Sequence, residues 1–229
     1  MAARQPTATV PGIDAGLLAA RAAEIIAAGR FFAAHGWAPA TAGNYSARLD
    51  ADHLAITVSG CHKGQLGDED VMVVDLAGRA IGSARTSSAE TLLHTQLMAD
   101  YPAIGAVLHT HSVAATVLSM IEPDSRTIIL SGYELLKIFD GCNTHDINAV
   151  VPVFDNSQDI AALSAEVRAE LDTYLPPPEA PPGLPAVPGY LIRGHGVYTW
   201  GTDMTAARHH AEALEFLFAC ELERARIGY

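Results

Sequence analysis

Apolar residues recur at helical spacing in several segments of the chain. Asp14 can cap a helix that runs to about His35 and ends before Gly36. Its apolar stripe consists of Leu17, Leu18, Ile25, Ile26, Phe31 and Phe32. The same reasoning predicts helices over residues 89–101, 113–120, 134–139, 159–175 and 205–226.

Short apolar runs between these segments predict strands. They cover residues 54–58, 71–76, 106–111, 127–130, 149–154 and the region 190–200. Residues 41–46 are interpreted as a turn, residues 1–13 as a loose segment, and the proline-dense stretch 176–188 as a surface loop. Helices that interleave with short strands predict a mixed α/β fold, with one domain over residues 14–229 and helices flanking a central sheet.

Composition excludes several classes of function. The chain has 229 residues, 49% of them hydrophobic, and 14 basic against 26 acidic residues give a net charge of −12. Such an acidic chain argues against nucleic-acid or anionic-membrane binding. No uncharged apolar run reaches the roughly 18 residues of a membrane span. Three separated cysteines without a CxxC pair fit a reducing compartment, and we expect a cytoplasmic protein.

The clearest chemical signal is a set of three histidines. His109 and His111 lie two residues apart on a predicted strand, so both imidazoles point to the same face. His195 stands between Gly194 and Gly196, which allow a sharp turn and leave its imidazole uncrowded. Three neutral imidazoles with one open position are typical of a catalytic zinc site. We see no clear partner spacing for His35, His53, His62, His94 and His145.

Two glutamates could serve as acid or base beside such a metal. Glu90 follows Ser87 by three residues, so it could instead complete a capping box at a helix start. Glu134 could instead be a carboxylate that interacts with a helix dipole. The pattern alone does not choose between these interpretations, or between the two glutamates.

Turns with glycine or serine could hold a phosphate group through backbone N–H groups. Each turn is a weak signal, because such turns are common for structural reasons, and they matter only if the fold brings them together. The candidate residues are Gly43, Asn44, Ser59, Gly60, Lys63, Ser87 and Ser88.

Several segments together resemble a known family. They are residues 41–46, 56–60, 88–91, 106–112, 133–137, 151–160 and 189–201. The chain resembles the class II aldolase/adducin family, and within it the methylthioribulose-1-phosphate dehydratases of methionine salvage. The resemblance implies a central, mainly antiparallel sheet flanked by helices.

The resemblance also implies roles for individual residues. His109, His111 and His195 would bind one Zn²⁺ per subunit, Glu134 matches the acid/base of the dehydratases, and Glu90 matches the glutamate of the sugar-phosphate aldolases. The substrate would be 5-methylthioribulose 1-phosphate, and the assembly a homotetramer with the site near a subunit boundary. Two alternatives remain open: an aldolase or epimerase for another sugar phosphate, and a non-catalytic assembly module like the adducin head.

Overall fold

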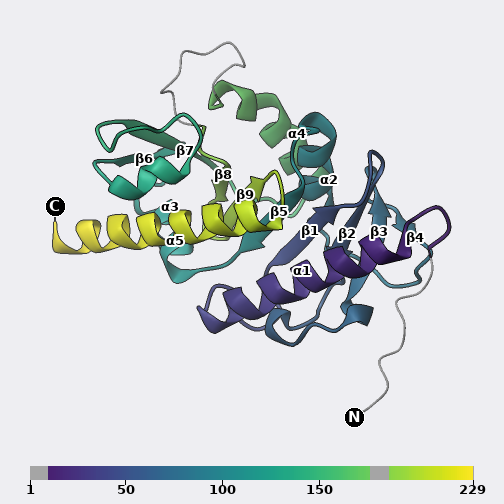
Figure 1. Ribbon diagram of the computed structural model, residues 1–229. Helices are drawn as coiled ribbons and strands as arrows, with labels where there is room; N and C mark the ends of the chain where they lie inside the picture. The colour runs from purple at the N-terminus through teal and green to yellow at the C-terminus, as the bar shows by residue number, and fades with distance from the viewer. Residues whose placement is uncertain (1–9, 176–185, 229) are drawn as a thin grey trace. The chain divides into compact units, whose positions relative to one another are not determined.

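The computed structural model describes residues 10–175 and 186–228 (Figure 1). The prediction of a loose segment over residues 1–13 and of a loop over 176–188 therefore falls mostly outside the described residues. The chain divides into two compact units: Met1–Thr110 with Thr202–Met204, and His111–Gly201 with Thr205–Tyr229.

Within residues 10–110 and 202–204, the first unit contains five strands, two α-helices and two short 3₁₀ turns. In the sheet its strands follow the order β4-β3-β2-β1-β5, and every neighbouring pair is antiparallel. In chain order the elements are α1 (Ala15–Ala34), β1 (Asn44–Arg48), β2 (His53–Thr57), η1 (Lys63–Gln65), η2 (Asp68–Asp70), β3 (Val71–Asp75), β4 (Ala80–Ile81), α2 (Thr91–Asp100) and β5 (Ala106–Thr110).

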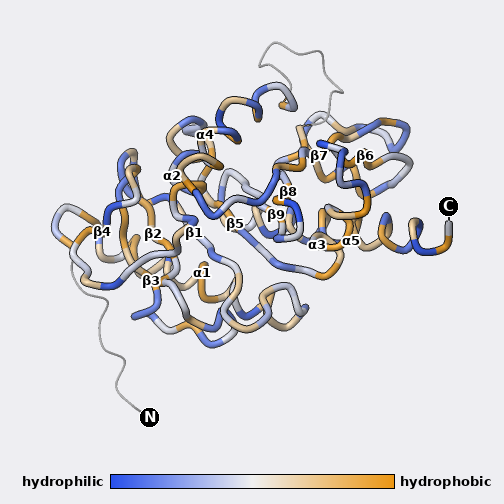
Figure 2. Tube along the Cα trace, turned by 180° about the vertical axis from the view of Figure 1, so that it is seen from behind, coloured by the Kyte–Doolittle hydropathy of each residue, from blue (hydrophilic) through white to orange (hydrophobic). Residues whose placement is uncertain are grey.

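Burial in the first unit follows the predicted apolar pattern. α1 begins where expected, because the Asp14 carboxylate accepts a hydrogen bond from the Leu17 amide at 2.6 Å. Hydrophobic positions run along β2 and β3 (Figure 2), and their side chains are buried, as Leu54 and Val74 illustrate. The expected turn at residues 41–46 is only half right, because β1 already begins at Asn44 and pairs with β5.

Within residues 111–175, 186–201 and 205–228, the second unit contains four strands, three α-helices and two 3₁₀ helices. Its strands follow the order β9-β8-β7-β6, with β7 and β8 parallel and the other neighbours antiparallel. In chain order the elements are α3 (Val113–Ile121), β6 (Thr127–Ser131), η3 (Glu134–Ile138), β7 (Asn148–Phe154), α4 (Ile160–Glu170), η4 (Leu171–Thr173), β8 (Gly189–Ile192), β9 (Gly196–Gly201) and α5 (Met204–Ile227).

The core of the second unit lies among its strands, α3 and α5. Leu130, Val151, Leu191 and Leu217 are all fully buried there. The mixed α/β fold with a large, mainly antiparallel sheet is confirmed. Among the described helices, none combines the length and the apolar character that crossing a membrane requires.

Candidate metal and substrate site

β5 delivers the first two histidines. His109 lies in β5 and is fully buried, and His111 follows directly after the strand. Ser112 then ends the extended stretch, because its hydroxyl accepts a hydrogen bond from the Ala115 amide at 2.9 Å and caps α3. The chain thus passes from strand to helix within two residues of His111, which fixes the backbone on both sides of the pair.

Gly43 lets β1 approach the backbone at His109. Its φ of +83° lies in the left-handed region, and a Cβ atom there would meet the His109 carbonyl oxygen at 2.8 Å. Any larger residue would push against β5 at the position of a candidate ligand. Gly43 therefore has a structural reason to be glycine, besides the predicted contact with phosphate.

His195 is held by a tight turn between β8 and β9. Gly194 adopts a φ of +64°, and the His195 amide donates to the Ile192 carbonyl at 3.0 Å. The Thr116 hydroxyl of α3 donates to the His195 carbonyl, also at 3.0 Å. The rings of His111 and His195 lie 4.6 Å apart, edge to face.

Arg193 fastens this turn to the end of α3. Its guanidinium donates to the Asp155 carboxylate at 2.8 Å and to the carbonyls of Ser119 and Ser125, each at 2.8 Å. The Ser119 hydroxyl accepts from the Gly194 amide at 2.9 Å. The planar guanidinium makes several directed hydrogen bonds at once. It therefore holds Arg193, and with it the turn that carries His195, against the end of α3.

The structure brings the three predicted histidines together. His109, His111 and His195 each offer one ring nitrogen, and these atoms all lie within 4.8 Å of one another. The set is purely imidazole, which suits Zn²⁺ and other first-row transition metals. The geometry therefore fits the metal site that the sequence predicts.

Glu90 lies beside this cluster. Its Oε2 is 3.5 Å from His109 Nε2, and its side chain is 14% exposed. The same oxygen accepts a hydrogen bond from Asn44 Nδ2 at 2.7 Å. The alternative interpretation as a capping box is not supported, because Glu90 occupies the N-cap position of α2 and makes no capping hydrogen bond. Its carboxylate lies against His109 and does not cap α2.

The predicted phosphate turns lie next to one another. Asn44 Nδ2 donates to Ser88 Oγ at 3.2 Å, and Val58 forms a β-bridge with Ser87. The Ser59 amide donates to the Thr86 carbonyl at 3.0 Å. The fold therefore brings the candidate phosphate-binding turns together, as the prediction requires.

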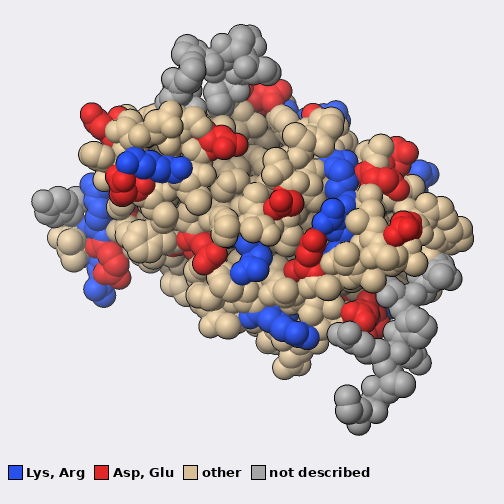
Figure 3. All heavy atoms as spheres, viewed as in Figure 1, with Lys and Arg blue, Asp and Glu red and all other residues tan. Residues whose placement is uncertain are grey.

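A phosphate would have to be held locally by such turns. On the face drawn in Figure 3, basic and acidic side chains lie in small groups among uncharged ones. Gly60 has a φ of +76°, and a Cβ atom there would meet nothing within 4 Å, so its backbone faces open space. Backbone amides at open turns can bind an anion without a basic surface.

Lys63 ties two of these turns together. Its side chain is buried, and Nζ donates to the carbonyls of Thr41 at 2.8 Å and Cys61 at 2.7 Å. Burial lowers the pKa of Lys63, and nearby Cys61, Asp70 and Glu90 oppose this effect. Gly29 of α1 makes room for this segment, since a Cβ atom there would lie 2.3 Å from the Lys63 carbonyl oxygen. The geometry makes Lys63 a bridge between turns.

Replacing Lys63 with methionine tests this bridge. The variant leaves two carbonyls without their donor, so we expect the free energy of unfolding to fall by about 1–3 kcal/mol. Because the turns are no longer joined, KM for a phosphorylated substrate should rise more than kcat falls. Urea unfolding and steady-state kinetics measure both effects. Arg79→Met, at an exposed ion pair with Asp75, is the control; equal stability losses in both variants would contradict the bridging role.

Glu134 lies in a different environment from Glu90. It begins η3, its side chain is 72% exposed, and Oε1 binds Lys137 Nζ at 2.5 Å. The hydrogen bond from Lys137 lowers the pKa of Glu134, and His145 Nδ1, 3.7 Å from Oε2, acts in the same direction. A shallow, apolar pocket of about 520 Å³ lies here, lined by Tyr133, Glu134, Leu135 and Phe216.

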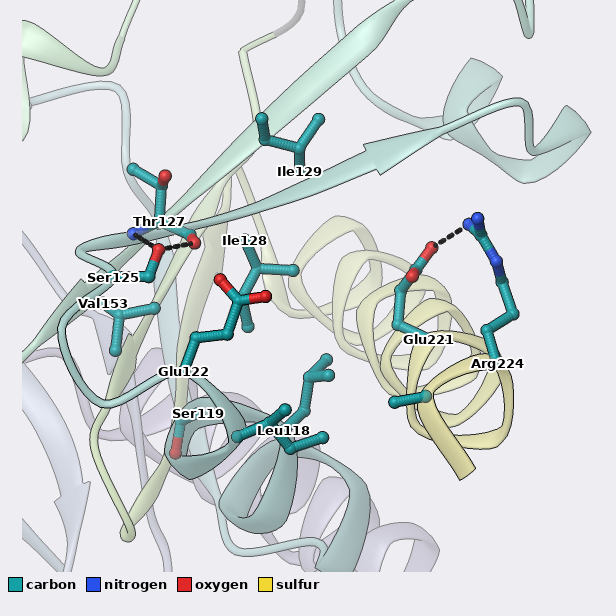
Figure 4. Close-up of a pocket in the computed structure, with 12 residues that line it drawn as sticks. Leu118, Ser119, Glu122, Ser125, Thr127, Ile128, Ile129, Val153, Glu221 and Arg224 are labelled. Carbon is teal, nitrogen blue, oxygen red and sulfur yellow. Dashed lines mark hydrogen bonds and ion pairs between the residues drawn. The ribbon is translucent and has the colours of Figure 1, made fainter. Parts of the chain in front are cut away.

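A second cavity, of about 390 Å³, lies among α3, β6 and the end of α5 (Figure 4). Glu122 points into it, and Glu221 pairs with Arg224 along one side at 2.9 Å. Its lining contains no histidine and none of the predicted site residues. We therefore do not assign the predicted chemistry to this cavity.

His94 was missed at the level of sequence. It is fully buried in α2, where Nδ1 lies 2.8 Å from Ser46 Oγ and Nε2 makes a short hydrogen bond with Asn44 Oδ1. No sequence spacing pointed to His94, because its hydrogen-bond partners Ser46 and Asn44 lie on β1, far from it in the sequence.

His94 also predicts a pH dependence of stability. Burial lowers its pKa from 6.5 to about 4, an effect that the charge of Glu90 opposes. The unfolded chain therefore binds a proton at this position at a higher pH than the folded chain does. Between pH 6.5 and 4 this difference should remove about 3 kcal/mol of stability as pH falls. Urea unfolding at pH 7, 5 and 4 should show a smaller loss in His94→Gln; parallel curves for both proteins would contradict the assignment.

Comparisons with known proteins agree with the fold and with the predicted family. Residues 23–222 match the Class II Aldolase and Adducin N-terminal domain, so the chain belongs to the class II aldolase and adducin family. The chain is 57% identical to the methylthioribulose-1-phosphate dehydratase of Marinobacter nauticus over 91% of its length and 96% of that protein. It is 55% identical to the Pseudomonas aeruginosa dehydratase over 87% of its length and 92% of that protein. These matches confirm the predicted resemblance to the dehydratase branch, whose members are lyases.

Solved structures give the same fold. A putative aldolase/epimerase/decarboxylase, YgbL of Escherichia coli, aligns with a TM-score of 0.73 at 22% identity, over 91% of each chain. The L-fuculose-1-phosphate aldolase of Thermus thermophilus aligns with a TM-score of 0.69 at 24% identity, over 93% of this chain and 99% of that one. At these identities the likeness establishes the architecture only.

Proposed function

We propose that the chain is a cytoplasmic, zinc-dependent hydro-lyase of methionine salvage. It converts 5-methylthioribulose 1-phosphate into 2,3-diketo-5-methylthiopentyl 1-phosphate and water. The observation that carries this proposal is the cluster of His109, His111 and His195, with the Glu90 carboxylate beside it, in a chain 57% identical to a dehydratase along nearly its whole length.

His109, His111 and His195 would hold one Zn²⁺ per subunit. Three protein ligands leave a coordination position open, which is the arrangement of catalytic zinc sites. When bound, the cation would polarise the C2 carbonyl and the C3 hydroxyl of the substrate and thereby acidify the C3 hydrogen. The sugar phosphate would reach it with its phosphate on the turns around Gly43, Asn44, Ser59, Gly60, Ser87 and Ser88.

The reaction needs one group that accepts a proton and one that supplies a proton. Glu134 accepts the C3 proton as the C–H electron pair moves toward C2, and the C4–O bond then breaks. The departing hydroxyl group takes up a proton and leaves as water, while the resulting enol tautomerises to the 2,3-diketone. Glu90, beside His109, positions the hydroxyl groups of the substrate and is the second candidate for the base.

We further propose that the site is completed in a homotetramer. Glu134 is 72% exposed in the single chain, and a base works best where water is excluded. Exposed apolar side chains lie around it, including Leu135, Ile138 and Phe216. α3, hydrophobic along its length in Figure 2, adds Val113 and Met120, which are 74% and 56% exposed. Surfaces of this kind are typical of subunit interfaces.

Turnover by the purified protein tests the proposal. Incubation with 5-methylthioribulose 1-phosphate should give a diketone absorbance and a product lighter by one water in mass spectrometry. Chelation should abolish the reaction, and Zn²⁺ should restore it. Cleavage into two carbon fragments would indicate an aldolase, and an isomer of unchanged mass would indicate an epimerase. A folded protein that binds no metal and turns over nothing would indicate an assembly module.

A further inference from the structure

We propose that His94 is a positioning residue that acts through Asn44. It holds the side-chain amide of Asn44 in one orientation, so that the NH₂ group faces Glu90 and fixes that carboxylate beside His109. This inference rests on the proposed function, because it assigns the purpose of the arrangement to a reaction in which Glu90 takes part.

The Asn44 side chain makes three contacts. Nδ2 donates to Glu90 Oε2 at 2.7 Å and to Ser88 Oγ at 3.2 Å, so both of its hydrogens have acceptors. Oδ1 lies against His94 Nε2. Since an amide oxygen only accepts, Nε2 must carry the hydrogen of this contact. His94 is thus the donor that recognises the oxygen end of the amide.

The tautomer of His94 is set on its other side. A neutral imidazole with its hydrogen on Nε2 has a lone pair on Nδ1, which accepts from the Ser46 hydroxyl at 2.8 Å. Burial keeps the ring neutral, as its pKa of about 4 indicates. A series of hydrogen bonds therefore runs from Ser46 through His94 and Asn44 to Glu90, and every donor in it points toward the carboxylate.

The opposite direction of these hydrogen bonds is disfavoured by the Glu90 carboxylate at the end of the series. If the amide of Asn44 turned over, Oδ1 would face Glu90 Oε2 at hydrogen-bond distance, and two acceptors would oppose each other. His94 would then need its hydrogen on Nδ1. In a buried network such an unmet acceptor is costly. His94 and Glu90 thus select the same amide orientation from opposite ends.

For the reaction, this arrangement fixes where the Glu90 carboxylate lies. Glu90 sits at the start of α2 without a capping bond, and Asn44 of β1 reaches across to it. A side chain with several rotatable bonds would otherwise sample positions away from His109. Misplacement by about 1 Å of a group in a reacting site can cost roughly 100-fold in rate. His94 secures Glu90 without touching the substrate.

Two neutral amides at position 94 provide a matched test. His94→Gln can place an N–H group where Nε2 lies, whereas His94→Asn is shorter and reaches only toward Ser46. In the zinc-loaded enzyme we expect His94→Asn to lower kcat about 10- to 100-fold with KM within about threefold of wild type. His94→Gln should retain most of kcat. Zinc content should be unchanged in both.

A double-mutant cycle with Asn44→Ala shows whether His94 acts through Asn44. We expect the double variant His94→Asn/Asn44→Ala to be no slower than Asn44→Ala alone. Losses that multiply, or a His94→Gln variant as slow as His94→Asn while folded, would overturn the proposal.

An independent measurement does not need the reaction. In ¹⁵N-labelled holoprotein, the Asn44 NH₂ hydrogens should exchange slowly with solvent in wild type and His94→Gln, and fast in His94→Asn. Equal exchange in all three would overturn the orientation itself. If wild type fails to dehydrate the sugar phosphate, the proposed function falls, and the exchange rates still decide the role of His94.

Discussion

Replacing His195 with alanine is expected to abolish binding of the proposed Zn²⁺ and, with it, dehydration. The variant keeps two imidazoles, His109 and His111, and loses the one that the turn at Gly194 holds against them. Loss of an outer-shell partner alone weakens metal binding by about 10- to 100-fold. Loss of a direct ligand should therefore exceed roughly 100-fold. Metal analysis after gel filtration and competition with a chromogenic chelator measure this effect.

The matched control is His209→Ala. His209 lies on the exposed side of α5, so its removal should change neither zinc content nor kcat. A His195→Ala protein that is folded, keeps one zinc per chain and turns over at the wild-type rate would contradict the metal site and the mechanism built on it.

Replacing Glu134 with glutamine will lower kcat by about 10³-fold while zinc content and folding stay intact, because the amide cannot accept the C3 proton. Stopped assays with the zinc-loaded protein measure the loss. Glu223→Gln is the control, since Glu223 is also exposed and pairs with Arg226 at the same spacing as Glu134 with Lys137. Should Glu90→Gln be inactive and Glu134→Gln active, the base is Glu90.

Mixing two inactive variants shows whether Glu134 acts in its own subunit or in a neighbouring one. If Glu134 serves the metal site of a neighbouring subunit, mixing Glu134→Gln with His195→Ala chains should restore activity. If the two variants are mixed in equal amounts and assemble at random, about a quarter of the sites will contain both an intact His195 and an intact Glu134. If both residues serve the same chain, mixing restores nothing, and the base acts within its own subunit.

Local rules predicted the parts of the fold that depend on near neighbours. The Asp14 cap, the apolar stripe of α1 and the strand that carries His109 follow from spacing alone, and the structure agrees. The start of β1 was missed because Gly43 and Asn44 are turn residues by composition. Pairing with β5 overrides that preference.

The candidate site likewise has parts that depend on neighbours in the sequence and parts that depend on long-range contacts. The His-x-His pair and the Gly-His-Gly turn are local patterns, and both are visible in the sequence. The partners of His94 and Lys63 lie on other elements, at Asn44 and Ser46 for His94 and at Thr41 for Lys63. A single sequence holds no direct record of such long-range hydrogen bonds. For the same reason, spacing could not distinguish the two interpretations of Glu90.

The N-cap position of α2 places chemistry and folding in competition at residue 90. The Glu90 carboxylate is held beside His109 and makes no capping hydrogen bond, so it adds little to the stability of that helix. Selection for heat resistance alone would be free to replace it, and variants obtained that way should unfold later and work more slowly. Engineering a sturdier form of this enzyme should therefore leave position 90 untouched and strengthen helix ends elsewhere.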